Sequence, residues 1–290
     1  MKCFGLPDET RISSVHLRTV DLGRSLEFYR RVLGLKAITQ NAASASLSAT
    51  GQSPALIVLS EDSAATPHPP RATGLYHFAI RYPERTDLAH ALRRLARNDY
   101  PLQGASDHIV SEAIYLSDPD ENGVELYADR PRSQWVWRDG QVAMSTEPLD
   151  TLNLLSLVET QPERMDAPLL TDIGHIHLHV AGLDEAERFY HEFLGLAVTQ
   201  RSYPSALFFA AGGYHHHVGA NTWAGKTRAP VNSVGLISYR LTVPVREILY
   251  CLRHRAPIAG YESSSQASET GEELLRIRDL NGNWLEVVAN

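Results

Sequence analysis

Two stretches of the chain combine a strand-like alternation with a helical spacing of apolar side chains. Residues 173–180 alternate between apolar side chains and three histidines, His175, His177 and His179. This alternation predicts a strand that buries one face. Residues 183–194 then carry apolar side chains at helical spacing, and Gly195 follows as a stop signal. The stretch therefore predicts a strand, a short turn and a helix.

The same pattern occurs 161 residues earlier, in residues 12–35, where Phe28 and Tyr29 align with Phe189 and Tyr190. Three further pairs of positions show the same offset: Ser14 with His175, His77 with Ser238, and Glu125 with Glu286. One offset at several separate landmarks indicates an internal repeat.

Within each half, the order strand, helix and short strands occurs twice, which predicts an α+β fold of four βαβββ modules paired into two domains. We expect an N-terminal domain at 1–130, a connector at 131–170 that contains Trp135 and Trp137, and a C-terminal domain at 171–290. Short strands are expected at 206–209 and at 215–219 in the second half.

The composition is that of an ordinary soluble globular protein, with 43% hydrophobic and 21% charged residues. The formal net charge of −7 disfavours a nucleic-acid partner. No apolar run is long enough to span a membrane, and the first residues lack the apolar core of a signal peptide. The two cysteines, Cys3 and Cys251, do not suggest a disulfide framework, so we expect a cytoplasmic protein.

The opening H-x-x-L-x-V…FY…LGL and the closing DPDENGVEL resemble the vicinal oxygen chelate superfamily of glyoxalases, fosfomycin-resistance enzymes, bleomycin-binding proteins and extradiol catechol dioxygenases. The segments LYHFAI, SDPDENGVELYADRPRSQW and AGGYHHHVGANTWAG are similar to the two-domain catechol 2,3-dioxygenases of Bacillus and related bacteria. The resemblance implies that each domain folds its two modules into an open, cup-like mixed sheet around a metal ion or a ligand.

The resemblance also implies metal ligands at three strand positions in a domain. These positions hold Ser14, His77 and Glu125 in the first half, and His175, Ser238 and Glu286 in the second. Each half therefore lacks one of the three ligands, and a different one.

Two imidazoles and a carboxylate suit a ferrous ion that must also bind substrate and oxygen. The preferred site combines His175 and Glu286 with a third residue, His215 or His217. The resemblance implies an acid–base catalytic histidine on this strand; His217 fits that position best, and His215 is the second candidate. In a regular strand His215 shares the face of His217, and His216 points the other way. The pair His77 and Glu125 forms a second candidate site, although such a pair is more often structural.

Four further residues are candidates for substrate contacts. Trp223 and Asn221 suit a ring-stacking wall and an amide contact, and Ser238 leaves a corner of the site open to substrate. Arg276 aligns with Tyr115, at a position where the resemblance implies a substrate-binding tyrosine, and an arginine there suits an anionic oxygen.

These features predict an extradiol ring-cleaving dioxygenase (EC 1.13.11.-) that uses Fe²⁺, with Mn²⁺, Zn²⁺ and Ni²⁺ as alternatives. Its partners would be a small aromatic substrate and O₂, with no nucleic acid or membrane, and a homodimer is the candidate assembly. Two other classes stay open: a glyoxalase-like metal-dependent lyase or isomerase, and a metal-free protein that binds small molecules.

Overall fold

The computed structural model describes residues 5–267 and 273–290. Its contacts divide the chain into two compact units. Unit 1 comprises Met1–His16, Thr66–Tyr76 and His175–Asn290, and unit 2 comprises Leu17–Ala65 and His77–Gly174. The division falls within three strands, β1 (Arg11–Thr19), β5 (Ala72–Tyr82) and β12 (Asp172–His179). The division of the sequence into domains at 1–130 and 171–290 with a connector at 131–170 remains a prediction.

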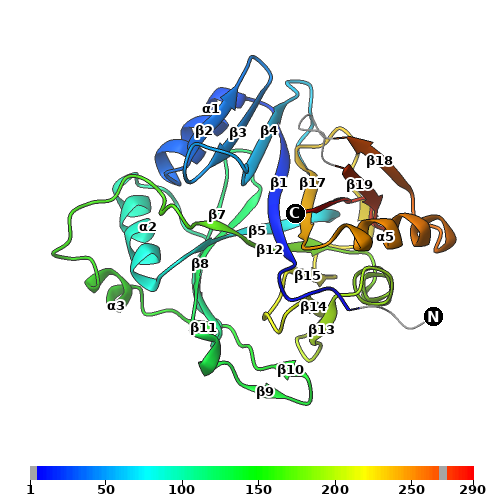
Figure 1. Ribbon diagram of the computed structural model, residues 1–290. Helices are drawn as coiled ribbons and strands as arrows, with labels where there is room; N and C mark the ends of the chain where they lie inside the picture. Colours follow the sequence, from blue (N-terminus) through cyan, green and yellow to red (C-terminus); the bar gives the residue numbers. More distant parts are fainter. Residues whose placement is uncertain (1–4, 268–272) are drawn as a thin grey trace. The chain divides into compact units, whose positions relative to one another are not determined.

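Unit 2 contains two groups of strands (Figure 1). In the first, β3 (Ser44–Ser48) pairs antiparallel with both β2 (Lys36–Gln40) and β4 (Ile57–Glu61). In the second, the order is β6-β7-β8-β5, and β8 runs parallel to β5. The bounds of its members are Gly104–Asp107 for β6, Ser111–Ser117 for β7 and Gly123–Asp129 for β8. The other elements of the unit are α1 (Leu22–Glu27), η1 (Phe28–Val32), α2 (Arg85–Arg97), η2 (Arg132–Gln134), β9 (Trp137–Arg138), β10 (Gln141–Val142), β11 (Glu147–Pro148) and α3 (Thr151–Ser156).

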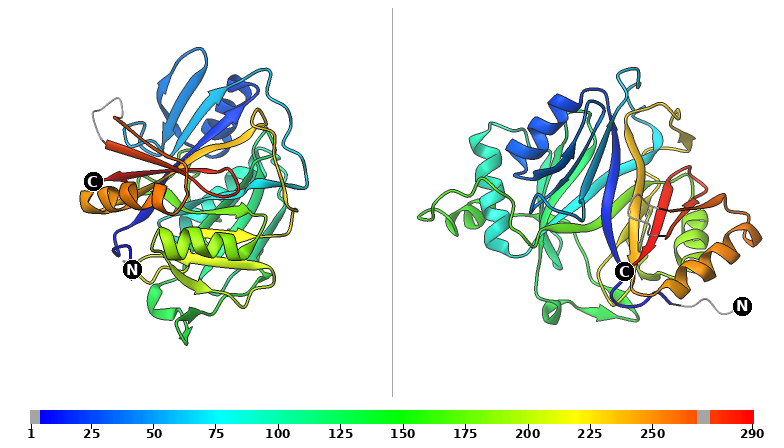
Figure 2. Two further views of the ribbon diagram at one scale, coloured as in Figure 1. Left: turned by 90° about the vertical axis from the view of Figure 1, so that its right-hand side faces the viewer. Right: turned by 45° about the horizontal axis from the view of Figure 1, so that its top comes forward.

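Unit 1 repeats both groups. In the first, β12 runs parallel to β15 (Val218–Asn221), which continues through β14 (Ala206–Ala210) to β13 (Ala197–Gln200). In the second, β17 (Gly235–Val243) runs parallel to β20 (Trp284–Ala289), followed by β19 (Glu273–Arg278) and β18 (Ser263–Ala267). The strand β16 (Thr227–Arg228) pairs with the start of β5. Figure 2 shows the helices of this unit, α4 (Leu183–Ala186) continued by η3 (Glu187–Phe193), and α5 (Arg246–Ile258).

A tyrosine fixes the first helix of each half to a polar turn. Tyr29 on η1 donates a hydrogen bond of 2.8 Å to Asp118, in the turn between β7 and β8. Tyr190 on η3 donates the equivalent bond of 3.0 Å to Asp279. Both tyrosines are fully buried, and their apolar rings supply core packing while each hydroxyl satisfies a buried carboxylate.

The pairing of residues between strands follows the sequence repeat residue by residue. His77 on β5 pairs with Gly123 on β8, and Ser238 on β17 pairs with Trp284 on β20. All four positions follow the 161-residue offset. The predicted α+β fold of repeated modules with open, curled mixed sheets is confirmed.

No helix in the described part of the chain has the length and apolar character needed to cross a bilayer.

Candidate metal centre

Three neighbouring strands of unit 2 present a row of side chains on one face. Glu125 on β8 is the register partner of Ala79 on β5 and of Tyr115 on β7. His77 lies two residues before Ala79, so its side chain points to the same face. Ala79 and Ala113 are small and fully buried, and together with Tyr127 they form the floor beside this row. The small side chains leave room above the floor for the longer polar ones.

His77 and Glu125 make direct contact. The distance from His77 Nε2 to Glu125 Oε2 is 3.0 Å, and the two residues are 6% and 3% exposed. Two ligands of one metal ion, each about 2.1 Å from it and at about 90° to each other, are separated by about 3.0 Å. The contact therefore has the spacing of two ligands as well as that of an ion pair.

The next strand, β12, approaches this floor because residue 174 is a glycine. A Cβ atom at Gly174 would overlap the Tyr127 hydroxyl and lie 2.6 Å from its Cζ. His175 is the next residue of the strand, and its side chain is 1% exposed.

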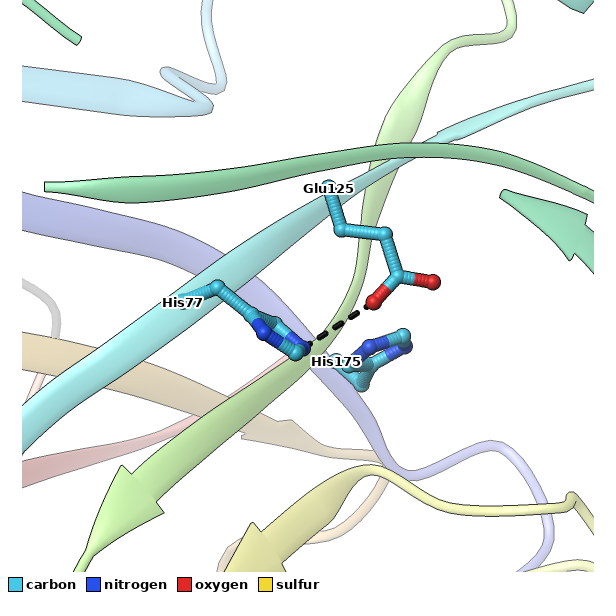
Figure 3. A group of neighbouring side chains, drawn as sticks. All are labelled: His77, Glu125 and His175. Carbon is cyan, nitrogen blue, oxygen red and sulfur yellow. Dashed lines mark ion pairs between the residues drawn. The ribbon is translucent and has the colours of Figure 1, made fainter. Parts of the chain in front are cut away.

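Ligand atoms of His77, Glu125 and His175 all lie within 4.8 Å of one another. Figure 3 shows that the three side chains point toward one another. Among the described residues, this is the one group of three or more such side chains close enough to hold a metal ion. Two imidazoles and a carboxylate form the donor set of the non-haem ferrous oxygenases and leave further coordination positions open. A buried carboxylate beside two imidazoles carries a desolvation cost that a bound cation offsets. The residues present therefore fit a divalent metal.

Tyr115 lies at the edge of this group, with its ring centre 5.7 Å from that of His77. Its hydroxyl is 2.6 Å from His108 Nε2, and His108 Nδ1 donates a 2.7 Å hydrogen bond to the carbonyl oxygen of Ser145. Because a carbonyl only accepts, the Nδ1 atom carries the proton, and a neutral His108 then accepts from Tyr115 at Nε2. Sequence reasoning did not find His108, because it lies outside the aligned ligand strands.

The histidine tract does not have the strand geometry that was expected. Gly212 and Gly213, with φ values of +62° and +60°, form a turn, and β15 begins only at Val218. As a result His216 packs on His175 at a ring-centre distance of 4.1 Å, and His215 lies at 6.0 Å.

The remaining contacts of the tract define two environments. His215 Nδ1 and His216 Nδ1 are 2.8 Å apart, so one of the two rings donates to the other. His217 has its ring beside Tyr214, and its Nδ1 accepts a 3.2 Å hydrogen bond from the Ala211 amide. His216 is thus the member of the tract packed most closely on His175, whereas His217 fixes the turn.

Asn221 and Trp223 belong to an aromatic cluster of unit 1. Asn221 is fully buried; its Oδ1 accepts from His179 Nδ1 at 2.7 Å, and its Nδ2 donates to His177 Nε2 at 3.0 Å. The amide therefore orients both imidazoles. Trp223 is 45% exposed and packs against His177 and the half-exposed Tyr76.

Glu286 lies among arginines. Its carboxylate accepts a 3.0 Å hydrogen bond from Ser238 and a 3.1 Å hydrogen bond from Arg240, and Arg276 Nε lies 3.7 Å away. The expected set of His175, Glu286 and His217 is not among the close ligand groups of the described residues. The two guanidinium groups beside Glu286 are positively charged, so they disfavour the binding of a metal cation there.

Comparison with known proteins agrees with this architecture. The sequence profile of the Glyoxalase/Bleomycin resistance protein/Dioxygenase superfamily matches residues 11–126. The chain is 43% identical to the catechol-2,3-dioxygenase of Bacillus subtilis (strain 168) over 288 residues, which cover 97% of this chain and 98% of that protein.

Solved structures share the fold at low identity. Glyoxalase I from Zea mays gives a TM-score of 0.60 at 15% identity, with 97% of this chain and 92% of that one covered. A Bacillus subtilis protein provisionally described as a dioxygenase gives 0.67 at 12% identity, with 99% and 86% covered. Repeat, strand register and full-length similarity together show that this chain belongs to the Glyoxalase/Bleomycin resistance protein/Dioxygenase superfamily.

Proposed function

We propose that the protein is an extradiol dioxygenase that cleaves a catechol-type aromatic ring, with His77, Glu125 and His175 as its metal ligands. The buried group of two imidazoles and one carboxylate carries this proposal. The full-length similarity to a catechol-2,3-dioxygenase supports the choice of reaction. This ligand set replaces the combination of His175, Glu286 and His217.

Ferrous iron is the metal that we propose, with Mn²⁺, Zn²⁺ and Ni²⁺ as alternatives. When bound, the ion would supply a Lewis acid for the two catechol oxygens and an open position for O₂. The protein's own contribution is a dry, preorganised set of donors, since all three ligand residues are almost fully buried.

Tyr115 and His108 would handle a substrate proton. With its own proton directed at His108 Nε2, the Tyr115 oxygen would face a substrate hydroxyl as a hydrogen-bond acceptor. The Ser145 carbonyl fixes the His108 tautomer and so fixes the direction of that bond.

His216 would act as the acid–base group, with His215 as its proton partner at 2.8 Å. The packing of His216 on His175 supports this role. The partly exposed rings of Trp223 and Tyr76 pack with the buried His177 in unit 1, and this cluster suits stacking on an aromatic ring.

Metal content and oxygen uptake test the proposal. Wild-type protein purified without oxygen and supplied with Fe²⁺ should retain about one ion per chain and consume O₂ when catechol is added. Glu125→Gln keeps the shape but removes the charge, so it should lose both metal and activity. Glu286→Gln tests the other ligand set, His175, Glu286 and His217. If Glu286→Gln lost the metal and Glu125→Gln retained it, Glu286 and not Glu125 would be the ligand. Wild-type protein that binds no divalent metal would leave a ligand-binding protein as the function.

A cytoplasmic location and a homodimer remain predictions, and both can be checked by fractionation and by sedimentation.

A further inference from the structure

A second row of polar side chains lies in unit 1, on the repeat-equivalent strands. Arg276 on β19, Glu286 on β20 and Arg240 on β17 are successive register partners, so their side chains share one face of the sheet. Ser238 lies two residues before Arg240 on the same face. We call these four residues the arginine cluster.

The arginine cluster occupies strand positions that are equivalent to those of His77 and Glu125 in unit 2. Under the 161-residue offset, Ser238 stands where His77 is, and Glu286 stands where Glu125 is. Arg276 replaces Tyr115, and Arg240 replaces Ala79. Compared with unit 2, these positions of unit 1 therefore have the same carboxylate, a serine in place of the histidine, and two additional positive charges.

The charges of the cluster favour an anion. Glu286 is within 3.1 Å of Arg240 Nη2 and 3.7 Å of Arg276 Nε, so one carboxylate is shared between two guanidinium groups. The net charge of the four residues is positive, because the Ser238 hydroxyl is neutral. The Arg276 guanidinium also lies over the Trp284 ring, 4.8 Å from its centre, which fixes its plane.

Hydrogen-bond donors remain available in the cluster. The Nε atoms of Arg240 and Arg276 are buried and make no hydrogen bond to the described part of the protein. The two side chains are 37% and 24% exposed, so solvent reaches their outer ends. Buried N–H groups normally have an acceptor, and guanidinium groups bind carboxylates and phosphates through pairs of N–H donors.

We propose that the arginine cluster binds a small oxyanion, a carboxylate or a phosphate group, at a site separate from the metal ligands. Glu286 holds the two guanidinium groups in place in this site, and because its negative charge repels an anion, Arg240 and Arg276 are the residues that hold the occupant. The proposal does not depend on the catalytic one, because none of its residues is a proposed metal ligand.

Titration calorimetry on the metal-loaded protein, with sodium benzoate in one series and inorganic phosphate in another at constant ionic strength, tests the site. Saturable binding of either anion to the wild type is expected, and the tighter one identifies the carboxylate or the phosphate as the preferred group. Arg276→Gln and Arg240→Gln should each weaken binding at least tenfold, while Arg276→Lys should weaken it less because the charge remains.

Arg253→Gln is the matched control, since Arg253 is an exposed arginine of α5 that pairs with Glu273. Its affinity should match that of the wild type. The absence of saturable binding of both anions to the wild type would overturn the proposal. Equal affinity in the wild type and in the folded Arg240→Gln and Arg276→Gln proteins would also overturn it, because an anion at the metal would not respond to either change.

Discussion

At the residue scale, removal of the Tyr115 hydroxyl tests whether this group has a catalytic or a structural role. Tyr115→Phe removes the oxygen that lies 2.6 Å from His108, on a ring whose centre is 5.7 Å from that of the proposed ligand His77. Because the bound substrate hydroxyl would lose its hydrogen-bond acceptor, kcat/KM for catechol should fall roughly 10–100-fold while metal content stays unchanged. Tyr100→Phe is the control, since the Tyr100 hydroxyl donates to the Ser117 carbonyl and should affect only stability. Equal activity in Tyr115→Phe and the wild type would refute the substrate contact.

The histidine tract gives a second residue-scale prediction. His216→Ala should lower turnover by roughly 10²–10⁴, the usual contribution of a general acid–base group, with metal retained. His217→Ala should leave the activity of the folded protein near that of the wild type. Its cost is in stability, about 1–3 kcal/mol, because the buried Ala211 amide loses its acceptor. Oxygen uptake and urea unfolding of the two variants distinguish these outcomes. A larger loss of turnover in His217→Ala than in His216→Ala would assign the catalytic role to His217.

The sequence identified His77, Glu125 and His175 as candidates, yet it assigned them to two different sets. The 161-residue repeat states which positions are equivalent, but it does not state which equivalent positions are close in space. Proximity depends on how β12 passes the Tyr127 ring, and that depends on the absence of a side chain at Gly174. A single glycine before a histidine carries no signal of this kind in the sequence.

The orientation of the histidines in residues 215–217 could not be predicted from the sequence either, for a different reason. Alternation is valid only within a regular strand, and the two positive φ values at Gly212 and Gly213 place the histidines in a turn. The glycine pair was visible in the sequence, but the direction in which each imidazole points after it was not. In contrast, the strand registers of β5 with β8 and of β17 with β20 agree with the offset from the sequence alone.

At the scale of elements, the position of β12 can be tested through Gly174. In Gly174→Ala the new methyl group overlaps Tyr127, so the strand or the ring must shift. We expect a destabilisation of roughly 1–3 kcal/mol or more, together with loss of metal, because His175 follows directly. Gly104→Ala on β6 is the control, because its Cβ would meet no atom within 4 Å. Tyr127→Phe in the Gly174→Ala background should restore part of the stability, because it removes the hydroxyl that the new methyl group overlaps. Normal metal binding in Gly174→Ala alone would contradict this prediction.

The turn between β7 and β8 should make stability depend on pH. Burial raises the pKa of the Asp118 carboxyl to about 6, although hydrogen bonds from Asn122 and Tyr29 act to lower it. A pKa that is higher in the folded state than in the unfolded chain means that the folded protein binds the proton more tightly. The stability that this group contributes is therefore fully present below about pH 4 and is lost as the pH rises through about 6.

Urea unfolding between pH 4 and pH 7 checks this prediction. Asp118→Asn stays neutral, so the stability of the wild type relative to this variant should decline as the pH rises. Asp139→Asn, an exposed change in the turn between β9 and β10, should run parallel to the wild type. A constant difference between Asp118→Asn and the wild type across the range would show that the carboxyl does not titrate there.

At the scale of the whole molecule, the chain contains the same strand group twice with opposite chemistry on the equivalent faces. In unit 2 the face carries His77, Tyr115 and Glu125, whereas in unit 1 it carries Ser238, Arg276 and Glu286. The strand register is therefore the same in the two units, whereas the side chains on these faces differ.

The last prediction restores metal ligands to unit 1. Ser14→His and Ser238→His supply the two imidazoles at the offset positions, and Arg240→Ala with Arg276→Tyr removes the opposing charges. Strand β1 is held beside β17 in this unit, since Thr242 donates a 2.8 Å hydrogen bond to Ser13, the neighbour of Ser14. With Glu286 in place, the four changes should raise the metal content from about one to about two ions per chain. Adding Glu286→Gln should return it to one, which makes that variant the internal control. If the fourfold variant keeps a native circular dichroism spectrum and still binds one ion, then equivalent strand register is not sufficient for a metal site.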